Sequence, residues 1–263
     1  MFQMLSDLTN DDVDFMEVAP ENWIGIGGRF GRRFREYAER FPIVCHGLSL
    51  SIGAPAPLDV EFVREVGQFL REFNIRGYSE HLSYCSDDKG HLYDLMPIPF
   101  TEESAHYVAG RVRQVQDILG TQIALENVSY YAAPGQEIDE LSFVNTVLQE
   151  ADCLLLLDVN NIYVNSVNFG YDPHHYLQNL DLKRTAYVHV AGHFCEAEDL
   201  RIDTHGTTVD AEVWSLLEAA YELIGPVPTL LERDFNFPPL PELLGEINQI
   251  RTLQKAPKTV RPS

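Results

Sequence analysis

The sequence lacks several features that would place it outside the cytoplasm. Among its 263 residues there is no run of about 18 apolar residues, so we expect no transmembrane helix. The N-terminus, MFQMLSDLTNDD, has neither the basic nor the apolar segment of a signal peptide. The four cysteines form no CxxC pair, which argues against a zinc ribbon or a thioredoxin-like redox site. We therefore expect a cytoplasmic protein whose thiols are reduced and which has no membrane partner.

Basic residues and nucleotide-binding motifs are also scarce. The chain has 19 Lys and Arg against 40 Asp and Glu, which gives a net charge of −21. A surface this acidic repels phosphate backbones, so we expect no nucleic-acid partner. There is no P-loop and no serine nucleophile elbow, and the glycines of GIGG (Gly25–Gly28) are followed by Phe30 where a dinucleotide fingerprint needs a glycine. GIGG is therefore interpreted as a turn.

What the sequence does contain is a regular alternation of strand and helix patterns. Hydrophobic residues make up 45% of the chain, enough for a full core. The predicted strands are Asp14–Val18, Ile43–His46, Gly77–His81, Ile123–Glu126, Leu154–Asp158, Ala186–His189 and Thr229–Glu232. The predicted helices are Asp59–Phe73, Thr101–Leu119, Ile138–Glu150, Val209–Leu223 and Leu240–Leu253.

This rhythm predicts an α/β fold with a parallel sheet covered by helices, and specifically a TIM barrel. No linker or internal repeat divides the chain, so we expect a single βα-barrel domain over residues 1–263. A closed barrel of this type has eight strands, and the pattern supplies seven. We therefore expect a barrel that lacks its first strand.

The ends of the predicted strands carry the chemistry. The buried run LLLL at Leu154–Leu157 ends in Asp158, and residues of the same kind close five other strands. Together with a loop that supplies Asp203 and His205, the set comprises His46, His81, Glu126, Asp158, His189 and Glu232. The carboxyl ends of parallel barrel strands meet at one rim, so we expect these side chains to converge there.

So many ionisable groups in one place would be costly to bury unless something neutralised them. Few Lys or Arg lie near these strand ends, so a bound cation is the simplest solution. Mixed imidazole and carboxylate ligands suit iron, manganese or zinc. The number of ligands exceeds the need of one ion, which indicates two or more metals that share bridging carboxylates. His193, four residues after His189, is interpreted as a supporting or loop residue.

Eight motifs, which cover nearly the whole chain in order, resemble those of one family. They are HGLSLSIG (His46–Gly53), SEHLSY (Ser79–Tyr84), LMPIPFTEE (Leu95–Glu103), LENVSYY (Leu125–Tyr131), LLLDVNNIYVN (Leu155–Asn165), HVAGH (His189–His193), IDTHG (Ile202–Gly206) and LERD (Leu231–Asp234). The chain resembles the multinuclear non-heme iron-dependent oxidative enzymes, a family long known only as uncharacterised proteins and to which the methanobactin-maturation oxygenase belongs.

The resemblance implies a xylose-isomerase-like barrel that holds two or three irons and uses O2 to modify cysteines or other residues of a ribosomally made peptide. It also implies a small partner protein that delivers the peptide. The implied metal ligands are His46, His81, Glu126, Asp158, His189, Asp203, His205 and Glu232, with one of Asn160 and Asn161. Strand alternation favours Asn160, whereas a turn after Asp158 would present Asn161. The family usually begins with a Gly-Leu-Arg strand that is absent here, in agreement with the count of seven strands.

Our leading hypothesis is an iron-dependent oxidase or oxygenase of a peptide side chain. In it, His46 and His81 hold one iron and Asp158 and His189 a second, with Glu126 or Glu232 as a bridge. Asp203 and His205 then hold a third ion. The alternatives are a divalent-metal isomerase or phosphodiesterase on the same barrel, or an inactive metal-binding partner protein. Zinc and manganese are the alternatives to iron as the bound metal.

Overall fold

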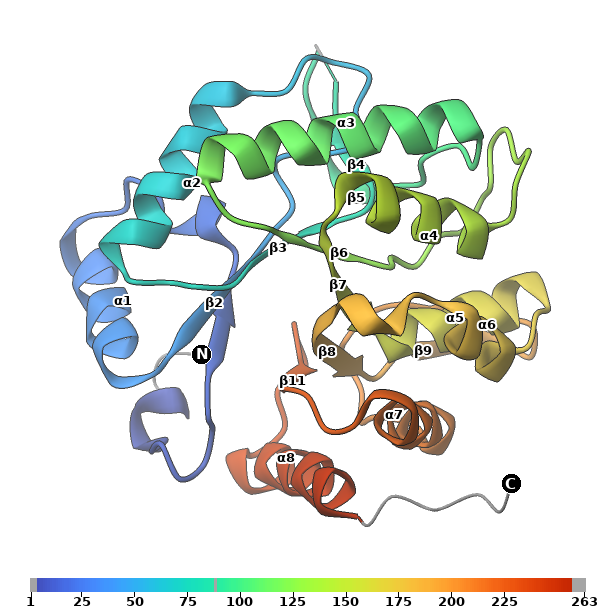
Figure 1. The fold of residues 1–263 in the computed structure, drawn as a ribbon. Helices are drawn as coiled ribbons and strands as arrows, with labels where there is room; N and C mark the ends of the chain where they lie inside the picture. Colours follow the sequence, from blue (N-terminus) through green and yellow to red (C-terminus); the bar gives the residue numbers. More distant parts are fainter. Residues whose placement is uncertain (1–3, 88, 257–263) are drawn as a thin grey trace. The chain divides into compact units, whose positions relative to one another are not determined.

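The structure is a computed structural model that describes residues 4–87 and 89–256 (Figure 1). Its contacts divide the chain into two compact units. Among the described residues, the N-terminal unit spans positions 5–154 and the C-terminal unit spans positions 155–256 together with Met4. Each unit has its own parallel strands and covering helices. The prediction of a single domain stays a prediction.

In the N-terminal unit, four parallel strands pair in chain order: β1 (Met16–Val18), β2 (Ile43–Gly47), β3 (Tyr78–His81) and β6 (Ala124–Glu126). The helices between and after them are α1 (Gly28–Arg40), α2 (Val60–Glu72), α3 (Glu102–Leu119) and α4 (Glu140–Ala151). A separate antiparallel hairpin, β4 (Tyr84–Ser86) with β5 (His91–Met96), follows β3. In Figure 1, α2, α3 and α4 lie along one side of these strands.

In the C-terminal unit, three parallel strands pair in chain order: β7 (Leu154–Asp158), β8 (Thr185–Ala191) and β11 (Thr229–Glu232). The boundary between the two units falls after Leu154, the first residue of β7. The helices are α5 (Val159–Phe169), α6 (Pro173–Asn179), α7 (Ala211–Ile224) and α8 (Leu240–Lys255). A second antiparallel hairpin, β9 (Phe194–Ala197) with β10 (Leu200–Ile202), follows β8.

Helices α2 and α3 begin where the sequence predicts because short polar side chains cap them. Asp59 accepts a hydrogen bond from the backbone of Phe62 at 3.0 Å at the start of α2, and Thr101 accepts one from Ser104 at 3.0 Å at the start of α3. The apolar face of α3 is then fully buried through Ala105, Val108, Ala109, Val112 and Val115. Capping and burial of the apolar face thus agree with the predicted helix.

All seven predicted parallel strands are present, with ends that differ by at most two residues. Three of the described helices (α1, α5 and α6) and both hairpins are absent from the predicted elements. Helix α1 is strongly charged, and the side chains that it buries are those of Phe34 and Tyr37. Helix α5 begins directly after Asp158, where β-branched residues and asparagines give little helical signal. Gly25 and Gly28 have positive φ, as the predicted turn requires. No helix among the described residues is long and apolar enough to cross a membrane.

Candidate metal centres

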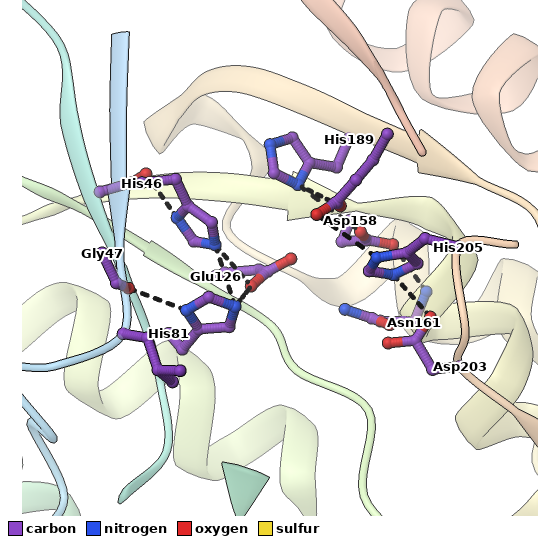
Figure 2. Close-up of polar contacts among 12 residues, drawn as sticks. His46, Gly47, His81, Glu126, Asp158, Asn161, His189, Asp203 and His205 are labelled. Atoms are coloured by element: carbon purple, nitrogen blue, oxygen red, sulfur yellow. Dashed lines mark hydrogen bonds and ion pairs between the residues drawn. The ribbon is translucent and has the colours of Figure 1, made fainter. Parts of the chain in front are cut away.

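The first candidate centre lies in the N-terminal unit, at the carboxyl ends of β2, β3 and β6. Parallel pairing sets His81 opposite Glu126, and it sets His46 opposite Ser79. Figure 2 shows the two imidazole rings and the Glu126 carboxylate pointing at one another. The ring centroids of His46 and His81 are 4.1 Å apart. The structure therefore brings together three of the predicted ligands.

The hydrogen bonds of the two imidazoles indicate which nitrogen of each ring carries the hydrogen. His81 Nδ1 lies 2.8 Å from the carbonyl oxygen of Gly47, which can only accept, so Nδ1–H donates. His46 Nδ1 lies 2.7 Å from the Ser79 hydroxyl, which itself donates to the Cys45 carbonyl at 3.3 Å. His46 Nδ1–H therefore donates to Ser79. In the neutral rings both Nε2 lone pairs then face inward.

The inward-facing atoms have the spacing of ligands around one ion. His46 Nε2 lies 3.1 Å from both His81 Nε2 and Glu126 Oε2, and His81 Nε2 lies 3.3 Å from the same carboxylate oxygen. Nitrogen and oxygen ligands about 2.1 Å from a metal are separated by roughly 3.0–3.4 Å. Two lone pairs and a carboxylate at this distance repel one another, and a cation between them would remove the repulsion. The residues therefore fit a metal ion.

The second candidate centre lies in the C-terminal unit. Pairing of β7 with β8 sets Asp158 opposite His189, and both side chains are 0% exposed. His189 Nδ1 lies 3.9 Å from Asp158 Oδ2 and 3.1 Å from Glu232 Oε2. Ligand atoms of the three residues all lie within 4.8 Å of one another. One imidazole and two carboxylates are thus gathered at the ends of three neighbouring strands, as a second metal site requires.

Glu232 also faces a third group around His205. Its other oxygen, Oε1, lies 3.3 Å from His205 Nδ1, which is 3.2 Å from Asp234 Oδ2, while His205 Nε2 lies 2.7 Å from Asp203 Oδ1. Figure 2 shows His205 next to Asp203. Glu232 therefore presents one oxygen to each neighbouring histidine, which is the arrangement of a carboxylate that bridges two ions.

Charge pairing shifts the pKa values of this group. Burial by itself lowers the pKa of His205, but the carboxylates of Glu232 and Asp203 raise it well above its usual value. Burial likewise raises the pKa of Glu232, but His205 and His189 hold it well below its usual range. A cationic group is thus favoured among these carboxylates. His205 also has a positive φ of 50°, an uncommon conformation for a residue other than glycine and one that clusters at functional sites.

The two asparagines after Asp158 have different contacts. Both lie in the first turn of α5, so strand alternation does not decide between them. Asn160 donates through Nδ2 to Asp203 Oδ1 at 2.9 Å, whereas the backbone N–H of Asn161 donates to Asp158 Oδ1 at 2.7 Å. Each asparagine is therefore tied to one of the predicted ligands. The choice of the ligating asparagine stays a prediction.

Two residues beside these centres were not among the predicted ligands. Asp234 pairs with His205, and the LERD motif, in which it follows Glu232 by two residues, was the available signal. His193 is buried and lies 2.9 Å from the Asn160 side-chain oxygen through Nδ1, and its supporting role stays a prediction. Neither contact can be derived from the sequence, because both depend on loops that follow the strands.

Solved structures with similar folds are xylose-isomerase-like TIM barrels. A D-psicose 3-epimerase from Clostridium cellulolyticum H10 matches with a TM-score of 0.67 and 10% identity, over 97% of this chain and 93% of the epimerase. A xylose isomerase-like TIM barrel protein from Mycobacterium smegmatis in complex with magnesium matches with a TM-score of 0.59 and 12% identity, over 96% and 86% of the two chains. At these identities the likeness shows the fold alone, and it confirms the predicted TIM barrel.

Relatives at the sequence level are UPF0276 proteins. One from Shewanella sediminis is 59% identical over 256 residues, which is 97% of this chain and 92% of the relative. Another, from Pseudomonas aeruginosa, is 58% identical over 243 residues, which is 92% of this chain and 85% of the relative. The model of the RiPP precursor modification enzymes MbnB/TglH/ChrH matches residues 1–255. The chain therefore belongs to this family of enzymes, which modify ribosomally made peptide precursors, as its motifs predict.

Proposed function

We propose that the protein is a multinuclear iron-dependent oxidase or oxygenase that uses O2 to modify cysteine or other side chains of a ribosomally made peptide. The observation that carries the proposal is the set formed by His46, His81 and Glu126. Two histidines and one carboxylate on one face of an ion are the ligand set of non-heme Fe(II) oxygenases, which leave positions open for O2 and substrate. Membership of a peptide-modifying family supports a peptide as substrate.

The C-terminal unit would hold two further ions. Asp158 and His189 would bind one, Asp203 and His205 the other, and Glu232 would bridge them through its two oxygens. This group has more carboxylates than imidazoles, and such hard ligands favour a more highly charged ion such as ferric iron. Iron bound in these groups would supply electrons for O2 reduction and a Lewis acid for a substrate thiolate.

The chain's own residues prepare these groups before any ion binds. The Gly47 carbonyl and the Ser79 hydroxyl hold the two imidazoles in the tautomer that ligates, and partners of this kind are worth about 10–100-fold in metal affinity. The Asp158 carboxylate is held by the backbone of α5 in the same way. Rigid strands and a helix start, rather than mobile loops, therefore set most of the ligand positions.

The exposed aromatic side chains and the net charge indicate which partners the protein would bind. A peptide substrate has to reach the strand ends of the barrel, and exposed aromatic side chains such as Phe235, 48% exposed beside the His205 loop, offer it apolar contacts. A chain of net charge −21 attracts basic segments, so a basic peptide leader or a small delivery protein with a basic face would complement it.

The test combines metal analysis with peptide turnover. Protein purified without oxygen should contain two or three irons, and it should modify a cysteine-bearing precursor peptide only when O2 is admitted. His46→Ala should lose about one iron and the activity, whereas His106→Ala, which removes an exposed histidine of the same unit, should lose neither. Equal turnover without O2 would instead favour a metal-dependent isomerase or phosphodiesterase. Metal retained without any turnover would favour a metal-binding partner protein.

A further inference from the structure

A histidine outside the proposed ligand set, His193, is buried beside the His205 group. It lies between β8 and β9 and is 3% exposed. The ring centroid of Tyr163 lies 5.2 Å from its own, and the Thr207 hydroxyl donates to its backbone carbonyl at 3.0 Å. Its ring and backbone are thus held from two sides. A buried, immobilised imidazole is well suited to orient a neighbour.

A line of hydrogen bonds leads from His193 to His205 within the C-terminal unit. His193 Nδ1 lies 2.9 Å from Asn160 Oδ1, and Asn160 Nδ2 donates to Asp203 Oδ1 at 2.9 Å. The same oxygen of Asp203 lies 2.7 Å from His205 Nε2. Figure 2 shows the Asp203 end of this line, directly beside His205.

The chemistry of the donors fixes the direction of every bond in this line. The Asp203 carboxylate only accepts, so the amide nitrogen of Asn160 has to face it. The amide oxygen of Asn160 then faces His193, and His193 Nδ1 has to carry a hydrogen. An amide can be placed in two orientations that differ by a half-turn, and a hydrogen on His193 Nδ1 favours the one that serves Asp203.

We propose that His193 is a positioning residue, whose Nδ1–H fixes the Asn160 amide and thereby turns Asp203 toward His205. This rests on the proposed function, because it assigns to His193 the preorganisation of the metal site at Asp203 and His205. The line orients side chains and does not conduct protons, since a side-chain amide does not readily give up or accept a proton.

The other ring nitrogen of His193 contributes little to this role. Nε2 lies 3.2 Å from Asp210 Oδ2, but the Asp210 side chain is 48% exposed. Water can therefore replace His193 at this carboxylate. The role of His193 therefore depends on Nδ1, and the two nitrogens can be tested separately by substitution.

Substitution of His193 by asparagine or by glutamine tests the two ring nitrogens separately. The amide nitrogen of His193→Asn stands near the place of Nδ1 and can still donate to Asn160, whereas that of His193→Gln stands near Nε2 and cannot. Asp210→Asn removes the charge at the exposed end. The matched controls are His175→Asn and His175→Gln on α6, where the side chain is exposed.

The probe is Mn2+ alone, titrated into metal-free protein and followed by calorimetry and by electron paramagnetic resonance. We expect His193→Gln to weaken one class of site by about 10–100-fold, the effect typical of lost support around a ligand. His193→Asn, Asp210→Asn and the His175 variants should bind within about threefold of the wild type. Equal affinities for His193→Asn and His193→Gln, whether both normal or both reduced, would overturn the proposal.

Crystal structures of the metal-free variants provide a readout that does not depend on metal. In His193→Gln the Asn160 amide should turn over and Asp203 should move out of hydrogen-bond distance of His205, while His193→Asn should keep both in place. Asp203 unmoved in His193→Gln would refute the positioning role. A wild type that binds no Mn2+ and no iron would refute the proposed function instead, and the crystal structures would still decide whether His193 orients Asp203.

Discussion

Substitution of Gly192 by alanine should destabilise the C-terminal unit. A Cβ atom at Gly192 would lie 2.3 Å from the backbone oxygen of Thr207, 2.5 Å from that of Thr208 and 2.6 Å from the Thr207 hydroxyl. Ordinary contacts of a Cβ atom begin near 3.4 Å. Two backbone carbonyls would therefore have to move by about 1 Å, and backbone, unlike the end of a side chain, cannot rotate away.

The size of the effect follows from this crowding. Overpacking by one methyl group in a closely packed region costs about 1–3 kcal/mol. For chains of this size, each kcal/mol lowers the Tm by about 2–4 °C. We therefore expect Gly192→Ala to lower the Tm by about 2–12 °C. Thr207 follows His205 by two residues and donates to the His193 carbonyl, so the shift should also reduce metal content.

Thermal unfolding followed by circular dichroism, with metal analysis of the same samples, measures both effects. The matched control is Gly245→Ala in the middle of α8, where a Cβ would meet no atom within 4 Å. Alanine is favoured over glycine in a helix by about 0.5–1 kcal/mol, so this variant should keep or slightly raise the Tm. A Gly192→Ala protein with an unchanged Tm and full metal content would refute the close approach on which the reasoning depends.

Three further predictions concern the two units separately. Glu126→Gln, which removes the charge of the first centre, should lower the iron content by about one ion per chain in elemental analysis. Phe235→Ala, which removes the exposed ring that lies on Gly206, should raise the KM for the precursor peptide about tenfold with little change in kcat, as steady-state kinetics would show. Tyr130→Phe removes a buried hydrogen bond of 3.1 Å to Glu140, so urea unfolding should show a loss of about 1.5–3 kcal/mol.

The strand ends could be predicted from the sequence because the same pattern occurs at each of them. A short apolar run that closes in a histidine or a carboxylate marks a barrel strand and its functional end. The structure places His81 beside Glu126 and Asp158 beside His189 through the register of neighbouring parallel strands. The register of these strands is set by which of their side chains are buried. The pattern of apolar residues in the sequence indicates those side chains.

The loops after the strands could not be predicted in the same way. The pairing of His205 with Asp234 depends on a backbone hydrogen bond from Asp234 to the His205 carbonyl at 3.1 Å. It also depends on the positive φ of His205. No periodic pattern encodes such a conformation, because it arises from contacts between segments about 30 residues apart. Helix α5 was missed for a related reason: tertiary packing outweighs its weak intrinsic helical preference.

Asp158 explains why a helix has to begin where the LLLL strand ends. One oxygen of its carboxylate accepts the backbone hydrogen bond that caps α5, and the other faces His189. The helix start fixes the rotation of the carboxylate, and the positive end of the helix dipole attracts its negative charge. The carboxylate in turn provides the cap that the weak helical sequence after it needs. The folding of α5 and the formation of the second centre thus depend on the same side chain, so that the strand, the helix and the ligand form one structural unit.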